Sequence, residues 1–136
     1  MYTTEISLRV RYAETDRMGY AYYGNYATYF EVARVEALRQ IGVTYKELED
    51  DGILLPVSEY HIKYFKPAYY DDEIVIKTSI VEVPGVRLKF EYETFVKDVQ
   101  INKASTDLVF VDKATGRPMK APDYVVEKLA SYFAKG

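Results

Sequence analysis

The chain contains no cysteine and no tryptophan, and His61 is its only histidine. The absence of cysteine excludes disulfides, thiolate metal sites and a cysteine nucleophile. A single histidine excludes any site that needs two histidine ligands from one chain, such as the H-E-x-x-H zinc motif. We therefore expect no metal site, and the lack of cysteine agrees with a reducing cytoplasm, where we expect the protein to be located.

Long hydrophobic runs and runs of like charge are also missing from the 136 residues, which carry a formal net charge of −3. No apolar segment approaches the roughly 20 residues needed to span a bilayer, so we expect no integral membrane segment. No basic cluster indicates nucleic-acid binding. The first ten residues lack the plan of a signal peptide. The length is typical of one domain, which we expect to cover residues 1–136.

Tyrosine is abundant, with 15 residues, and tyrosine is common at interfaces and in ligand clefts because its apolar ring carries a polar tip. Several tyrosines fall in residues 12–41, which predict the end of a strand, a loop and then a long helix that begins at Gly24 or Asn25 and runs to Gly42. Apolar residues recur in this helix at helical spacing: Tyr26, Tyr29, Phe30, Ala33, Ala37, Leu38 and Ile41. So wide an apolar surface requires broad cover.

Alternating apolar and polar residues elsewhere predict five strands, over residues 5–13, 53–64, 73–83, 86–97 and 101–111. Pro56 implies an edge, a bulge or a late start in the second of these. Short helices are predicted at 44–51 and 123–134. Because four strands follow one another after the long helix, we predict an α+β fold: an antiparallel five-stranded sheet wrapped around that helix. The long edge strands favour pairing into a two-fold dimer with a continuous sheet.

Asp16, in the loop before the long helix, is the leading catalytic candidate. Free backbone N–H groups at a helix N-terminus favour negative charge and stabilise an oxyanion. An acid in this position is also commonly a cap or a solvated loop residue, and the pattern by itself leaves both interpretations open.

The other titratable candidates have structural interpretations. We expect His61 to be a half-exposed strand residue, and Glu31 and Glu36 to lie on the solvated flank of the long helix, paired with Arg34 or Arg39. The adjacent acids Asp71 and Asp72 are typical of a solvated turn.

Several segments together resemble a known family. Asp16, Gly19, Tyr22, Tyr23 and Tyr26 match the motif D-x-x-G-x-x-Y-(H/Y)-x-x-Y that precedes a long helix in the 4-hydroxybenzoyl-CoA thioesterase family of hotdog-fold acyl-CoA thioesterases. The similarity is greatest to the YbgC-type branch associated with the bacterial Tol–Pal system. Further matches follow in order at residues 64–73, 109–112 and 115–118, so the resemblance covers nearly the whole chain. It implies a single hotdog domain and hydrolysis of an acyl-CoA without a cofactor, since CoA is part of the substrate.

The resemblance also assigns roles to residues. Asp16 would be the catalytic carboxylate, acting as nucleophile or as general base, and the backbone N–H of Tyr23 would polarise the thioester carbonyl. Many YbgC-type relatives have His where Tyr23 stands, whereas Tyr occurs in the 4-hydroxybenzoyl-CoA type. The acyl group would contact Gly19, Tyr22, Tyr26, Phe30, Tyr60 and His61, the last two from a neighbouring subunit in one arrangement. The CoA phosphates would contact Arg87, Lys89, Arg117 and Lys120.

The resemblance implies a homodimer, and beyond it a tetramer built as a dimer of dimers; the residues do not choose between them. The alternative function is a non-hydrolytic adaptor that binds acyl thioesters or lipids in the same groove. A hotdog dehydratase is less favoured, because such enzymes pair a histidine with an acid and His61 lies far from Asp16 in the sequence.

Overall fold

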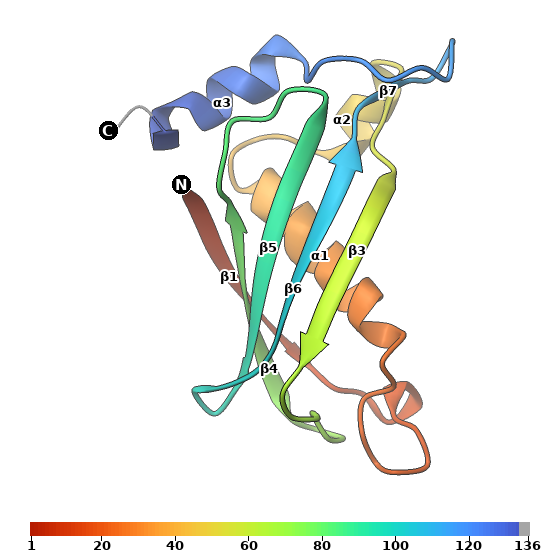
Figure 1. The fold of residues 1–136 in the computed structure, drawn as a ribbon, viewed down its shortest axis with the longest axis vertical. Helices are drawn as coiled ribbons and strands as arrows, with labels where there is room; N and C mark the ends of the chain where they lie inside the picture. Colours follow the sequence, from red (N-terminus) through yellow and green to blue (C-terminus); the bar gives the residue numbers. More distant parts are fainter. Residues whose placement is uncertain (134–136) are drawn as a thin grey trace.

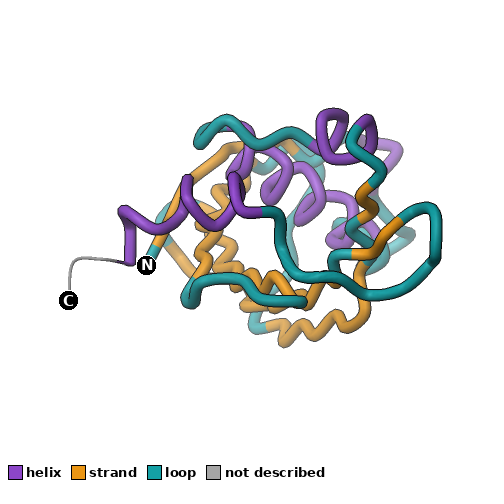
Figure 2. The backbone as a smooth tube through the Cα atoms, turned by 90° about the horizontal axis from the view of Figure 1, so that it is seen from above, coloured by secondary structure: helices purple, strands orange, loops and turns teal. Residues whose placement is uncertain are grey.

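The computed structural model describes residues 1–133 as one antiparallel sheet with a long helix across one face (Figure 1). The elements, in order, are β1 (Tyr2–Arg9), the 3-10 turn η1 (Tyr12–Glu14), α1 (Asn25–Arg39), α2 (Tyr45–Asp50), β2 (Ile53–Leu54), β3 (Val57–Tyr64), β4 (Glu73–Ile80), β5 (Arg87–Val96), β6 (Val99–Val109), β7 (Val111–Asp112) and α3 (Asp123–Phe133). The main sheet has the strand order β1-β4-β5-β6-β3. The helices lie on one side of the curved layer of strands (Figure 2). The predicted α+β architecture is confirmed.

The core lies between α1 and the inner face of the sheet. Alternate residues of β5 are buried, among them Phe90 and Tyr92, while their neighbours face solvent. Phe30 of α1 is completely buried and stacks on Tyr92, with the ring centroids 4.5 Å apart. The small residues Ala33 and Ala37 are buried on the same helix face, which lets the helix lie close to the strands. The period-2 and period-3.6 patterns therefore meet in one core, as predicted.

Several element boundaries differ from the predicted ones. β1 starts at Tyr2 and ends at Arg9, because the chain turns into η1 instead of continuing as a strand to residue 13. Pro56 separates β2 from β3, as a proline without an N–H donor would. β2 pairs with β7, a short strand that the sequence did not indicate. The predicted end of the last helix, at residue 134, lies outside the described residues.

The expected ion pair between Glu31 and Arg34 is absent. Arg34 is not on the solvated flank: it is only 7% exposed, and its Nε donates to the hydroxyl of Tyr45 at 3.3 Å. Tyr45, the first residue of α2, and Tyr92 of β5 both lie against its guanidinium. The companion pair did form, with Arg39 Nε 3.1 Å from a carboxylate oxygen of Glu36.

β3 is an edge strand, and within residues 1–133 no strand pairs with its outer edge. It pairs with β6 on one side only, and seven of its eight residues are exposed. Its exposed side chains include Val57, Tyr60 and Tyr64. Within residues 1–133, no helix combines the length and apolar character needed to cross a membrane.

Candidate active site

The loop before α1 holds the carboxylate of Asp16 in one orientation. Its Oδ1 accepts hydrogen bonds from the backbone N–H groups of Met18 (2.9 Å) and Tyr20 (3.3 Å). The backbone of Asp16 also bonds that of Tyr20 and Gly19. Gly19 has φ of +81°, a conformation that L-residues other than glycine adopt at a cost. The turn therefore leaves the second carboxylate oxygen of Asp16 available, since it makes no hydrogen bond to the described residues.

Glu14 anchors this loop to the helix, a role that the sequence analysis missed. Its backbone carbonyl accepts from the N–H of Tyr22 and the side-chain amide of Asn25, each at 2.8 Å. Its carboxylate accepts from the hydroxyl of Tyr29 at 3.0 Å and from Arg11 at 2.9 Å. Burial raises the pKa of Glu14, but the hydrogen bonds from Arg11 and Tyr29 lower it by more, so the net shift is downward. The close spacing of Arg11 and Glu14 was the only sequence signal.

The turn that enters α1 leaves one backbone donor free. The N–H of Asn25 donates to the carbonyl of Tyr22 at 2.9 Å, so residues 22–25 form a β-turn with Tyr23 as its second residue. Gly24 is the N-cap, and glycine has no side chain that could accept a hydrogen bond from the first N–H groups of the helix. Within residues 1–133, the N–H of Tyr23 donates to no acceptor. An unpaired N–H at a helix N-terminus is suited to bind a developing negative charge.

Asp16 and Tyr23 line the same open cavity of about 390 Å³. The full lining is Asp16, Met18, Tyr20, Ala21, Tyr23, Tyr26, Tyr64, Phe65, Lys66 and Pro67. The loop, the start of α1 and the end of β3 therefore meet at one site. Burial raises the pKa of Tyr26 to about 12, so at neutral pH its hydroxyl is protonated.

Phe30 and Tyr60 line a second cavity, of about 260 Å³, further along α1 and β3. Its other lining residues are Ala27, Thr28, Glu31, Arg34, Val57 and Thr106. A row of aromatic rings in contact lies between the two cavities. The ring centroids are 5.6 Å apart for Tyr64 and Tyr26, 6.2 Å for Tyr26 and Phe30, and 6.2 Å for Phe30 and Tyr60. We call this line of residues the α1–β3 groove.

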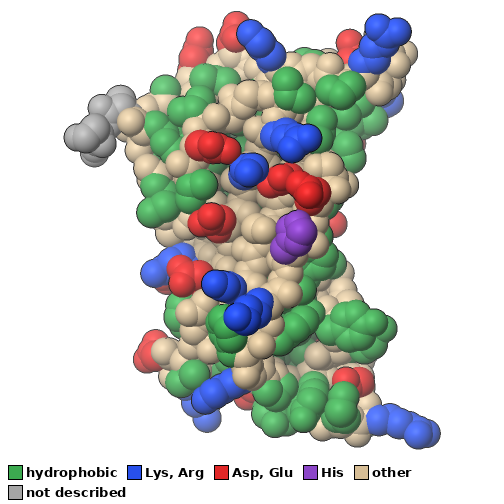
Figure 3. Space-filling view, viewed as in Figure 1, with side chains coloured by type: hydrophobic (Ala, Val, Ile, Leu, Met, Phe, Trp, Pro, Cys, Tyr) green, Lys and Arg blue, Asp and Glu red, His purple; other side chains and the backbone are tan. Residues whose placement is uncertain are grey.

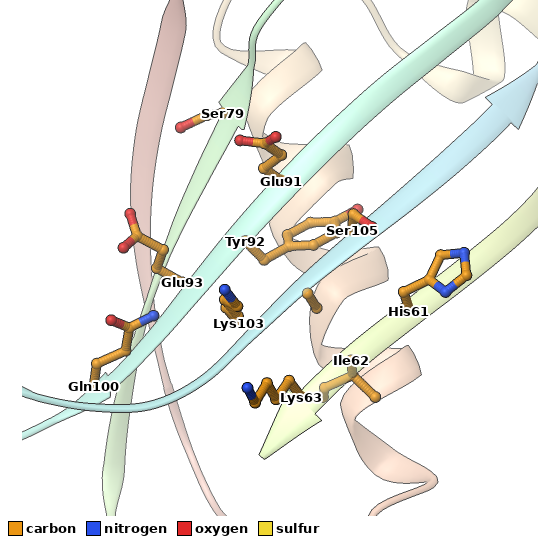
Figure 4. Close-up of a pocket in the computed structure, with 11 residues that line it drawn as sticks. His61, Ile62, Lys63, Ser79, Glu91, Tyr92, Glu93, Gln100, Lys103 and Ser105 are labelled. Atoms are coloured by element: carbon orange, nitrogen blue, oxygen red, sulfur yellow. The ribbon is translucent and has the colours of Figure 1, made fainter. Parts of the chain in front are cut away.

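His61 does not share a cavity with Asp16 in one chain. Consecutive strand residues point to opposite faces, so Tyr60 faces α1 and His61 faces outward. There its Nε2 lies 3.9 Å from a carboxylate oxygen of Glu59. His61 instead lines a shallow hollow of about 640 Å³ on the outer face of the sheet, with residues such as Glu91 and Lys103 (Figure 4). Acidic and basic side chains are interspersed over this face (Figure 3).

The remaining predicted contacts are spread over the surface. Arg87 and Lys89 are exposed on β5, and Arg117 and Lys120 are exposed between β7 and α3. None of these four lines the cavity that contains Asp16. Tyr22 is 46% exposed and packs on Tyr23, with the ring centroids 4.7 Å apart. Across residues 1–133, no three His, Cys, Asp or Glu side chains are grouped to hold a metal ion.

Comparison with known proteins supplies the family. The model of the thioesterase-like superfamily matches residues 10–129. The chain belongs to the thioesterase-like superfamily. It is 32% identical to YneP of Bacillus subtilis over 121 residues, which cover 88% of each chain. It is 31% identical to the acyl-CoA thioesterase YbgC of Haemophilus influenzae over 119 residues, 87% of this chain and 88% of that one.

A solved structure agrees with these relatives. The DHNA-CoA thioesterase of Staphylococcus aureus superposes with a TM-score of 0.92 at 33% identity, over 98% of this chain and 93% of that chain. The predicted resemblance to hotdog thioesterases of the YbgC type is therefore confirmed, together with the hotdog fold. In this chain, Asp16 and Tyr23 line one cavity.

Proposed function

We propose that this protein is an acyl-CoA thioesterase that hydrolyses R-CO-S-CoA to a free acid and CoA. The observation that carries the proposal is the shared cavity: it is lined by Asp16, whose carboxylate is held by backbone N–H groups, and by Tyr23, whose backbone N–H at the start of α1 is unpaired within residues 1–133. Hydrolysis of a thioester needs both parts: a group that delivers the nucleophile and a donor for the oxygen that becomes negative. The names of the H. influenzae and S. aureus relatives support the same reaction class.

The thioester carbonyl oxygen would accept the N–H of Tyr23, and the carbonyl carbon would face Asp16. In one route, the free oxygen of Asp16 attacks the carbon, the C–S bond breaks, and CoA leaves as the thiolate, which takes a proton from water. Water then hydrolyses the mixed anhydride. In the other route, Asp16 takes a proton from water as the water oxygen attacks, and that proton is passed to the sulfur when the C–S bond breaks. Both routes use the same two groups, and the geometry is compatible with each.

The first test is the substitution Asp16→Ala, assayed by free-thiol release from a panel of aliphatic and aromatic acyl-CoAs. The expected loss in kcat/KM is roughly 10²–10⁴-fold, because general acid–base or nucleophilic participation is worth this much. Asp50→Ala is the matched control, since Asp50 is an exposed acid on α2 whose one ion pair within residues 1–133 is with Lys46. Asp16→Asn is a weaker test because deamidation restores the acid. Wild-type turnover in a folded Asp16→Ala variant would exclude the assignment, and saturable binding without thiol release would favour an adaptor.

We also propose that β3 pairs with β3 of a second copy to form a homodimer. The support is the long uncovered edge, which presents unpaired backbone groups together with exposed Val57, Tyr60 and Tyr64. Such an edge in a monomer invites uncontrolled association. Light scattering coupled to gel filtration should give a mass that is an even multiple of the 15.8 kDa of one chain. A monomer at micromolar concentration would refute the pairing.

A further inference from the structure

Arg34 is a buried charge without a counter-charge. Only 7% of the residue is exposed, and no carboxylate oxygen within residues 1–133 lies within 4.0 Å of its guanidinium. Its Nε donates to the Tyr45 hydroxyl at 3.3 Å, and the Tyr92 hydroxyl is a second hydrogen-bonding neighbour of the guanidinium; both are neutral phenols and supply no counter-charge. Burying a charge is costly unless it is paired, so a buried arginine without an acid indicates an anion that arrives from outside the chain.

The guanidinium lines the second cavity of the α1–β3 groove, so an incoming anion has a place to bind. This cavity is about 260 Å³ in volume, and Phe30, Val57 and Tyr60 give it aromatic and aliphatic walls. Thr106, only 3% exposed, adds a hydroxyl that already bonds Tyr92 at 2.6 Å. Apolar walls with one buried fork of donors are suited to an apolar chain that ends in a planar anion.

The aromatic row of Tyr64, Tyr26, Phe30 and Tyr60 lies between this cavity and the cavity that Asp16 lines. α1 runs antiparallel to β3, so Tyr23 faces Tyr64 at one end, and Arg34 lies near Val57 at the other. Eleven residues separate Tyr23 from Arg34, which corresponds to roughly 16 Å of helix at about 1.5 Å per residue. The arginine side chain leans back toward the helix N-terminus and shortens this span. An acyl chain of medium length would reach from Tyr23 to the guanidinium of Arg34.

We propose that the α1–β3 groove binds an acyl group that carries a carboxylate at its far end, so that the preferred substrate is the CoA monothioester of a medium-chain dicarboxylic acid. The terminal carboxylate pairs with the guanidinium of Arg34, because the planar fork of arginine matches a carboxylate in a bidentate arrangement. The methylene chain lies along Tyr26, Phe30 and Tyr60. This inference rests on the proposed thioesterase function.

Glu31 lines the same cavity and opposes this binding. It is exposed to solvent, whereas Arg34 is buried, so water screens the acid far more than the arginine. Arg34 therefore favours binding of the terminal carboxylate more strongly than Glu31 opposes it. Replacing Glu31 should strengthen the preference for a terminal carboxylate, and replacing Arg34 should abolish it.

The experiment measures kcat/KM for suberoyl-CoA against octanoyl-CoA, which differ only in the terminal carboxylate. Wild type should prefer suberoyl-CoA, and Arg34→Met should lower the ratio about 100-fold, because truncating one side of a buried charge pair typically costs this much or more. Arg34→Lys should retain part of the preference. Glu31→Gln, a surface change that is expected to fold, should raise the ratio about threefold, the size of a screened surface interaction.

Two results would overturn the inference while the proposed function stands. One is hydrolysis of octanoyl-CoA with no preference for suberoyl-CoA in wild type. The other is an unchanged ratio in Arg34→Met; if the dimer of this variant also dissociates, Arg34 pairs with an acid of a second copy. If no acyl-CoA is cleaved, the proposed function fails, and thermal shift with free suberate against octanoate decides the inference. Stabilisation by suberate in wild type but not in Arg34→Met supports it, and equal shifts overturn it.

Discussion

Replacing Tyr23 with proline should remove the oxyanion donor and leave the fold intact. Proline lacks a backbone N–H, and the N–H of Tyr23 makes no hydrogen bond to residues 1–133, so no structural bond is lost. Tyr23 is the second residue of the turn closed by the N–H of Asn25, and proline is favoured at this position of a type I turn. The side chain is 65% exposed, so its removal opens no cavity in the core.

The size of the expected loss in kcat follows from the removal of one N–H donor, that of Tyr23. Loss of one oxyanion-hole donor costs about 2.7–4 kcal/mol of transition-state stabilisation, or roughly 10²–10³-fold in kcat. The phenol ring also packs on Tyr22 with the centroids 4.7 Å apart, and such a contact is worth at most about 1.5 kcal/mol. Tyr23→Ala loses the ring and keeps the N–H, so it is the matched control that separates the two contributions.

The assay is thiol release from one acyl-CoA that the wild-type protein turns over, with kcat and KM measured for wild type, Tyr23→Ala and Tyr23→Pro. We expect Tyr23→Ala to stay within about tenfold of wild type, since any cost is limited to the lost ring contact. Tyr23→Pro should fall at least a further 100-fold in kcat. Chemical denaturation should show that both variants are folded. If the two folded variants have the same kcat within about threefold, the N–H of Tyr23 does not stabilise the transition state.

Two further substitutions test the loop that carries Asp16. Glu14→Gln should lower the free energy of unfolding at pH 7 by about 1–2 kcal/mol, because Arg11 and Tyr29 donate to the charged carboxylate. The folded-state pKa of Glu14 lies below its ordinary value of 4.5, so the stability difference between wild type and Glu14→Gln should be complete above pH 4.5 and disappear as the pH falls through the folded-state pKa. Urea titrations at pH 7 and pH 3 measure this difference. An equal difference at both pH values would contradict the role of the charged carboxylate. Gly19→Ala should lower the free energy of unfolding by about 1–2 kcal/mol, because φ at this position is +81°, and should lower kcat because the turn that holds Asp16 shifts. Chemical denaturation measures the first effect and thiol release the second. Wild-type values in both assays would show that the turn tolerates a side chain.

Local patterns in the sequence were sufficient for the elements and their packing. Strict alternation over residues 86–97 made one face of β5 buried, and the helical spacing of Tyr26, Phe30 and Ala33 made one face of α1 its partner. Both patterns depend only on the backbone geometry of a strand or a helix, so neighbouring residues determine them. Pro56 marked the break between β2 and β3 for the same local reason.

Which side chains line the two cavities depends on contacts between residues that are far apart in the chain. Arg34 has the sequence position of a surface residue, one helical turn after Glu31. It is buried because Tyr45 from α2 and Tyr92 from β5 enclose it. Tyr60 and His61 are adjacent in sequence, but the pleat of β3 sends one toward α1 and the other to the outer face.

The sequence by itself determined which segments are helix and strand, which faces are apolar, and that Asp16 lies just before a long helix. Only the tertiary structure decided that Asp16 and Tyr23 share a cavity with the end of β3, that Glu14 ties the loop to α1, and that Arg34 is a buried charge in the same groove. The physical reason is that periodicity is a property of neighbouring residues. Burial of a charge depends on which distant elements pack against it.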